Sequence, residues 1–125
     1  MIGYVTLGTN DLARAATFYD ALAKELGTAR MMENEQFIAW GTPGAGAGIG
    51  LTKPFDGQAA TVGNGVMVAL SARDKAHVDR IYQCAMQSGA KDEGAPGPRG
   101  GGGFYAAYFR DPDGNKLNAF VMGQD

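Results

Sequence analysis

The sequence predicts an α+β fold made of two βαβββ modules in tandem. The expected elements follow the same order, strand, helix and three strands, in both halves of the chain. When the halves are compared at an offset of 63 residues, residues 4–19 align with residues 67–82 without a gap. Five of these sixteen positions are identical: Val5 and Val68, Leu7 and Leu70, Asp11 and Asp74, Ala13 and Ala76, Tyr19 and Tyr82. We therefore expect one domain built by duplication.

Length and composition limit the number of domains and the classes of partner that the chain can have. At 125 residues it fits a single domain, and 45% hydrophobic and 19% charged residues are typical of a globular protein. The net charge of -2 provides no basic surface for nucleic acid, and no apolar run approaches the ~18 residues of a membrane span. We expect neither a nucleic acid nor a membrane as partner.

Cysteine content and the start of the chain favour a cytoplasmic location. Cys84 is the only cysteine, which excludes an internal disulfide framework and fits a reducing compartment. Its apolar neighbours indicate a small buried hydrophobe rather than a reactive thiol. A strand is expected from Ile2, so no secretory signal is predicted.

The first module covers about residues 1–53. Residues 2–8 predict a strand, and Thr9 or Asn10 is expected to cap the helix that follows. Strands are expected at 29–32, 36–41 and 48–52. Residues 54–65 have no periodicity and predict a connector. The apolar stripe of the helix comprises Leu12, Ala15, Ala16, Tyr19, Leu22, Ala23 and Leu26, before a stop at Gly27.

The second module covers about residues 66–125. A strand at 66–70 precedes Ser71 and Asp74, which resemble a capping box, and a helix that ends near Gly89. A short extended piece at 90–93 leads into a glycine-rich loop at 94–103. Strands at 104–109 and 116–122 flank residues 111–114, whose Asp, Pro and Gly are typical of a type I turn chosen for backbone reasons.

The glycine-rich loop contains Arg99. The sequence argues against a phosphate-binding loop, because neither Lys-Ser nor Lys-Thr follows the glycines and no helix begins there. Two interpretations stay open. The loop is either a lid that carries Arg99 toward an anionic substrate or a flexible surface segment.

The order of these elements and several short motifs resemble the vicinal oxygen chelate superfamily, which includes glyoxalase I, extradiol dioxygenases and bleomycin- or fosfomycin-resistance proteins. The motifs are Leu12 with Phe18-Tyr19, residues 63–65 (Gly-Asn-Gly) and residues 111–115 (Asp-Pro-Asp-Gly-Asn). The resemblance implies a curled mixed sheet that forms a cup, with the helices outside and a divalent metal and a small substrate inside.

The metal ligands of that superfamily fall on four positions of this chain, and none carries a usual ligand. The positions are Tyr4, Gly50, Met67 and Asn118. Divalent ions of this kind prefer carboxylates or neutral imidazoles, whereas glycine offers no side chain and a thioether is a soft ligand. The only histidine, His77, is expected to face solvent on its helix. We therefore predict no metal and no cofactor.

Strand alternation and the resemblance together give a candidate ligand-binding set. Trp40 either lines the cup or is ordinary core. Tyr108 precedes Asn118 by ten residues, the spacing at which extradiol dioxygenases place an active-site tyrosine before their carboxylate ligand. Tyr4 and Tyr108 are the catalytic candidates, although no Lys, Arg or His is expected in the cup to activate a phenol. The set comprises Tyr4, Trp40, Gly50, Met67, Tyr108, Asn118 and Phe120.

Three functions remain open at this point. The first is a metal-free protein that binds a small aromatic or amphipathic molecule and forms a homodimer, as sequestering drug-resistance members of the superfamily commonly do. The second is a lyase or isomerase of the glyoxalase I type. The third is a scaffold domain with a vestigial cup, in which the candidate residues only fill a collapsed core.

Overall fold

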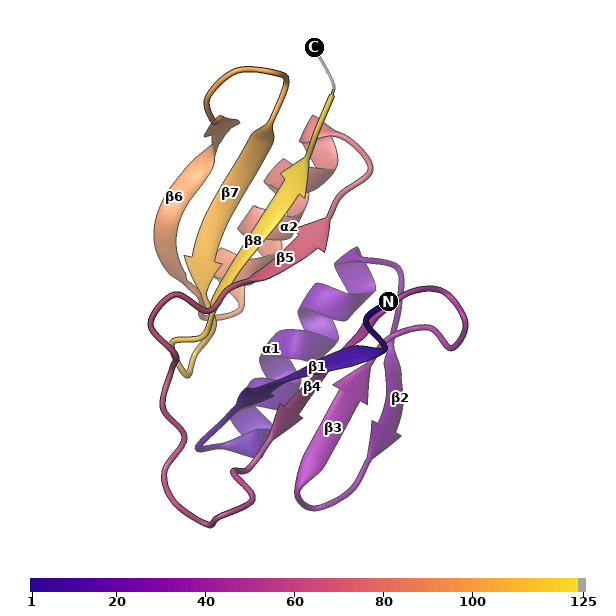
Figure 1. The fold of residues 1–125 in the computed structure, drawn as a ribbon, viewed down its shortest axis with the longest axis vertical. Helices are drawn as coiled ribbons and strands as arrows, with labels where there is room; N and C mark the ends of the chain where they lie inside the picture. The colour runs from indigo at the N-terminus through magenta and orange to yellow at the C-terminus, as the bar shows by residue number, and fades with distance from the viewer. Residues whose placement is uncertain (124–125) are drawn as a thin grey trace.

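A computed structural model describes residues 1–123 and contains two modules, each with a four-stranded mixed sheet and one helix (Figure 1). The first sheet has the strand order β1-β4-β3-β2, with β1 parallel to β4 and the other pairs antiparallel. The elements of this module are β1 (Tyr4–Gly8), α1 (Leu12–Glu25), β2 (Arg30–Glu33), β3 (Phe37–Trp40) and β4 (Gly48–Thr52).

The second module repeats this topology with the strand order β5-β8-β7-β6. The pair β5 and β8 is again parallel, and the other pairs are antiparallel. The two predicted βαβββ modules are thereby confirmed. The elements of this module are β5 (Val68–Ser71), α2 (Lys75–Gln87), β6 (Lys91–Pro98), β7 (Tyr105–Arg110) and β8 (Lys116–Val121).

Some boundaries differ from the prediction. Strand β6 runs through residues 94–98, which the sequence placed in a loop. An edge strand tolerates its two prolines because one side of the strand has no partner, and the register with β7 shifts at Gly94 and Gly97. The helix caps also differ, because the side chains of Asp11 and Asp74 accept the first-turn N–H groups in place of Thr9, Asn10 or Ser71.

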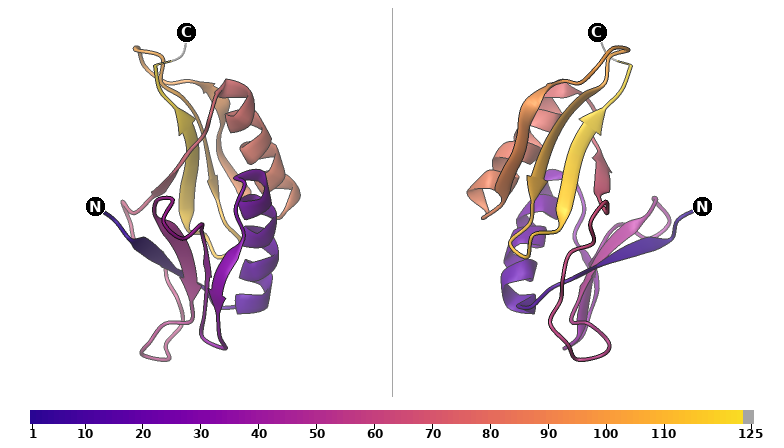
Figure 2. Two further views of the ribbon diagram at one scale, coloured as in Figure 1. Left: turned by 90° about the vertical axis from the view of Figure 1, so that its right-hand side faces the viewer. Right: turned by 60° about the vertical axis from the view of Figure 1, so that its left-hand side comes forward.

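Both modules contribute to one hydrophobic core. Helices α1 and α2 lie against each other on the same side of the molecule, with the sheets on the other side (Figure 2). The most buried core side chains therefore come from both halves of the chain. They include Phe18, Leu22, Leu51, Val78, Ile81, Phe109 and Leu117.

Each sheet has a face that packs on its helix and a face turned away from it, which we call the open face. The alternation of side chains places Tyr4 on the open face of the β1-β4-β3-β2 sheet and Met67 on that of the β5-β8-β7-β6 sheet. Tyr4 is 64% exposed and Met67 is 40% exposed.

His77 does not face solvent, so that prediction was wrong. It is 2% exposed and lies where α1 and α2 meet. Its Nδ1 accepts a hydrogen bond from the backbone N–H of Arg73 (3.1 Å), and its Nε2 lies 3.1 Å from the carbonyl oxygen of Glu25. A neutral ring with the proton on Nε2 satisfies both contacts. The hydrogen-bond partners of His77 are a backbone N–H before α2 and a backbone carbonyl oxygen in α1. The apolar stripe of α2 alone gave no indication of these partners.

Cys84 is half-buried at the same helix contact. Its Sγ donates to the carbonyl oxygen of Ala21 (3.4 Å), and burial raises the pKa of the thiol. No helix within residues 1–123 is long and apolar enough to cross a membrane.

Candidate functional site

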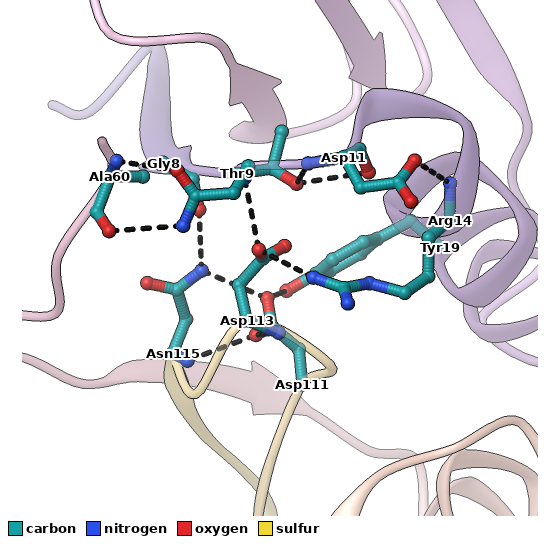
Figure 3. A network of polar contacts seen from close by, with 10 residues as sticks. Gly8, Thr9, Asp11, Arg14, Tyr19, Ala60, Asp111, Asp113 and Asn115 are labelled. Carbon is teal, nitrogen blue, oxygen red and sulfur yellow. Dashed lines mark hydrogen bonds and ion pairs between the residues drawn. The ribbon is translucent and has the colours of Figure 1, made fainter. Parts of the chain in front are cut away.

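The turn between β7 and β8 is organised by the side chain of Asp111 (Figure 3). Its Oδ1 accepts hydrogen bonds from the backbone N–H groups of Asp113 and Asn115, both at 2.9 Å. The N–H of Gly114 donates to the Asp111 carbonyl oxygen (2.9 Å), which closes the predicted turn. Asp111 is only 3% exposed, so its carboxylate is buried.

The same turn fastens the second module to the first. Oδ2 of Asp111 accepts from the Tyr19 hydroxyl at 2.7 Å, and Nδ2 of Asn115 donates to the carbonyl oxygen of Gly8 at 2.9 Å. Burial raises the pKa of Tyr19 well above its ordinary value, and the negative charge of Asp111 adds to that effect. We call Tyr19, Asp111 and Asn115 the clasp.

A second set of bonds supports the clasp at its edge. Oδ1 of Asp113 accepts from the backbone N–H of Asn10 (3.0 Å) and from Nη2 of Arg14 (2.8 Å). The Asp113 side chain is 3% exposed. Sequence reasoning treated this turn as a backbone device and missed its role between the modules. Two aspartates and an asparagine at every second position were the available signal.

The open face of the first sheet carries aromatic and thioether side chains. The Phe37 ring covers Gly50 so closely that a Cβ on Gly50 would lie 2.2 Å from Cε1 of that ring. The sulfur of Met31 lies near Gly48, and a Cβ on Gly48 would be in ordinary van der Waals contact with it (3.5 Å). With Tyr4 exposed beside them, this face offers aromatic and thioether surface.

Trp40 lies on the opposite face of that sheet. Its Nε1 donates to Oδ1 of Asp20 in α1 (2.8 Å), and its ring centroid is 5.4 Å from that of Tyr19. Trp40 is 4% exposed and belongs to the core, but it also borders a cleft of about 640 Å³. The cleft lies between the C-terminal half of α1 and β5, and Met67 lines it as well.

The open face of the second sheet brings three of the predicted residues together. Tyr108 pairs directly with Asn118 across β7 and β8, and Ala106 pairs with Phe120 one position along. The Phe120 ring stacks on Phe104 with centroids 5.9 Å apart. Asn118 is 2% exposed, and its Oδ1 is buried without a hydrogen-bond partner among the described residues.

Two cations accompany Tyr108, contrary to the expectation that the cup holds none. The guanidinium of Arg99 and the ammonium of Lys116 each lie 5.5 Å from the centre of the Tyr108 ring. Lys116 precedes Asn118 by two residues, so strand alternation already placed both on one face. Arg99 is folded back on its own strand, where Nη2 donates to the carbonyl oxygen of Ala95 (2.7 Å).

A second hollow of about 490 Å³ adjoins this face. Its walls are Arg110, Lys116 and residues 62–67 of the connector, which include the Gly-Asn-Gly motif. Arg110 pairs with Glu93 and donates from Nη1 to the carbonyl oxygen of Gly114 (2.9 Å).

The residues at the four metal positions do not fit a divalent ion. Within residues 1–123, no group of three or more His, Cys, Asp or Glu side chains is placed to hold a metal. Tyr4 and Gly50 lie on the first sheet, and Gly50 is covered by Phe37. Met67 and Asn118 belong to the second module, and they offer a thioether and an amide.

Comparisons with known proteins agree on a family. Residues 1–119 match the sequence profile described as the Glyoxalase/Bleomycin resistance protein/Dioxygenase superfamily. A glyoxalase/bleomycin resistance protein from Albidiferax ferrireducens is similar in structure, with 36% identity and a TM-score of 0.87 over 96% of this chain and 97% of that one. No curated protein sequence showed significant similarity to the chain.

A more distant structure shares the fold. The glyoxalase/bleomycin resistance protein/dioxygenase family enzyme from Burkholderia phytofirmans has 18% identity and a TM-score of 0.76, over 96% of this chain and 97% of that one. At this identity the likeness concerns the fold alone.

Proposed function

This chain belongs to the glyoxalase/bleomycin resistance protein/dioxygenase superfamily, and from that premise we propose that it binds a small aromatic or amphipathic molecule without a metal ion. The observation that carries the proposal is Asn118. A buried amide oxygen without a partner costs about 1–3 kcal/mol, and a bound ligand with an N–H or O–H group would remove that cost.

The ligand contacts come from both modules. On the second sheet, Tyr108 and Phe120 supply flat aromatic surface beside Asn118, which suits a planar molecule. On the first sheet, Tyr4 and the Phe37 ring over Gly50 supply the apolar counterpart. Trp40 and Met67 border the cleft between α1 and β5, through which a larger ligand would extend.

The proposal includes a homodimer in which the open face of one module meets the open face of the other module from a second copy. Neither of the two hollows described above is lined by Tyr4 or Asn118, so these hollows do not join the two faces within one chain. Large apolar side chains near the open faces are 40–64% exposed, which is typical of a surface that a partner covers. They are Ile2, Tyr4, Met31, Met32, Val66 and Met67.

Binding is tested by calorimetric titration and by quenching of Trp40 and tyrosine fluorescence with aromatic and glutathione-conjugated compounds. We expect saturable binding that the variant Asn118→Ala weakens without a large loss of stability. Gln58→Ala, which truncates an exposed amide side chain of the connector, is the matched control. A large loss of stability in Asn118→Ala, or no binding across the panel, would contradict the proposed site.

Two further measurements separate the alternatives. Stoichiometric micromolar binding of Ni, Zn, Mn or Fe(II), with turnover of methylglyoxal and glutathione, would favour a lyase. Sedimentation equilibrium tests the dimer, because we expect twice the chain mass of 13.0 kDa. A stable monomer that binds ligand would show that one chain is sufficient.

A further inference from the structure

We propose that the ligand of the second sheet is a planar aromatic anion whose carboxylate is held by Lys116 and Arg99 beside Tyr108. This inference rests on the proposed binding function and adds the charge of the ligand. The open face of the second sheet differs in the sign of its charge from the protein as a whole.

The open face of the second sheet carries an excess of positive charge. Arg110 pairs with Lys91 on β6 and with Lys116 on β8, so the three cations share one row across the sheet. Arg99 lies over the neighbouring Tyr108, and Glu93 is the carboxylate that pairs with Arg110. Four cations therefore face one carboxylate, in a chain of net charge -2.

Three of these four cations, Lys91, Arg99 and Lys116, form no ion pair within residues 1–123. Arg99 donates to the neutral carbonyl oxygens of Ala95 and Gly97, which orient the guanidinium and leave its charge uncompensated. Lys116 has no carboxylate within 4 Å in the same part of the chain. Arg99 and Lys116 are both half-buried beside one aromatic ring, and an anion close to both would be attracted to each of them.

The position of Arg99 is built into the strand. A Cβ on Gly94 would lie 3.2 Å from Nη2 of Arg99, and one on Gly97 would lie 3.2 Å from Nη1. The guanidinium therefore lies directly against the backbone of these two glycines. The hydrogen bonds from Arg99 to the carbonyl oxygens of Ala95 and Gly97 hold the guanidinium at the site without a moving lid.

One buried atom without a partner also indicates a ligand here, and a hollow adjoins the site. Oδ1 of Asn118, which is 2% exposed and unpartnered within residues 1–123, belongs to the residue that pairs directly with Tyr108. The hollow of about 490 Å³ adjoins this site only at Lys116, because its other walls are Arg110 and residues 62–67, and neither Tyr108, Asn118 nor Arg99 lines it. A planar acid would lie beside Tyr108 while its carboxylate meets Lys116 and Arg99.

The test compares 2-naphthoate with 2-naphthalenemethanol, a neutral molecule of nearly the same size and shape, by isothermal titration calorimetry on the full chain. We expect the naphthoate to bind about 10-fold more tightly at low salt, as one charge-assisted hydrogen bond provides. The ratio of the two affinities should fall to about 1 in Lys116→Met and stay near its original value in Lys116→Arg. Lys24→Met, which removes the same charge from an exposed position of α1, should keep it.

Each outcome decides between the two proposals. Equal affinity for both compounds in the unaltered chain would overturn the anionic ligand and leave the binding function intact. Failure of both compounds and of the wider aromatic panel to bind would overturn the binding function itself. If Lys24→Met lost the preference as fully as Lys116→Met, long-range charge would explain it and the local assignment would be wrong. Thermal melts of all three variants show whether they fold.

Discussion

Replacing Tyr19 with phenylalanine removes one hydroxyl from the clasp and tests whether that clasp holds the modules together. The hydroxyl donates to Asp111 at 2.7 Å, and Tyr19 is 2% exposed. The ring itself packs against Phe18 and Trp40 and remains in Tyr19→Phe. The substitution therefore isolates the hydrogen bond from the packing.

The magnitude follows from the partner and its burial. A hydrogen bond to a charged group contributes about 1.5–3 kcal/mol, and water cannot replace it at a buried site. Asp111 retains three other donors, from Asp113 and from the backbone and side chain of Asn115, so its carboxylate is not left bare. We expect Tyr19→Phe to lower the free energy of unfolding by about 1.5–3 kcal/mol, or Tm by about 5–12 °C.

The effect should depend on pH at the alkaline end. Burial and Asp111 raise the pKa of Tyr19 in the folded chain, whereas an unfolded tyrosine ionises near ~10. Below pH ~10 both states keep the proton, and the full stabilisation is present. Above that pH the unfolded chain binds fewer protons, so stability falls by up to ~1.4 kcal/mol per pH unit. Phenylalanine has no proton to lose, and the gap between the two proteins should narrow as pH rises.

Urea unfolding monitored by circular dichroism between about pH 7 and 11 measures both effects. Tyr82→Phe is the matched control because Tyr82 occupies the equivalent position of the second module and donates to Asp92 (2.9 Å) at an exposed site. We expect it to cost less than about 1 kcal/mol. Equal losses in the two variants, or a gap for Tyr19→Phe that does not change with pH, would refute the assignment of the clasp.

Three further substitutions test other parts of the structure by urea unfolding. Gly50→Ala should cost about 1–3 kcal/mol, since the new Cβ meets the Phe37 ring, and most of this loss should disappear in the background Phe37→Ala. His77→Ala should cost about 2–4 kcal/mol because it removes a buried ring and two hydrogen bonds at the helix contact, and an unchanged stability would contradict this packing. Arg14→Ala should cost about 1–3 kcal/mol by leaving the buried Asp113 carboxylate without its cation, and a loss equal to that of any exposed arginine would argue against the bond.

Local patterns were sufficient for the order of the elements. Period-2 and period-3.6 patterning reports which face of a segment is apolar, and the repeat between residues 4–19 and 67–82 doubled the signal. The error in β6 has a specific cause. Its glycines and prolines are poor strand formers, but an edge strand has ladder bonds on one side only and accepts them.

The candidate site was predicted only in part. Tyr108 and Asn118 were assigned to one face by alternation, and the pairing of β7 and β8 brings them side by side. Trp40 was left open between pocket and core, and its bond to Asp20 places it on the helix side. Lys116 was missed although it obeys the same alternation as Asn118, because a lysine at the first position of a strand ordinarily extends into solvent.

The sequence by itself determined the two modules and their element order, because these depend on residue types and on distances along the chain. The tertiary structure alone decided how the modules meet. His77 is buried and Asp111 reaches Tyr19 because packing of α1 on α2 brings residues 92 positions apart into contact. A buried polar group needs a hydrogen-bond partner, which can come from any part of the chain. Local sequence patterns do not predict which distant residue supplies it.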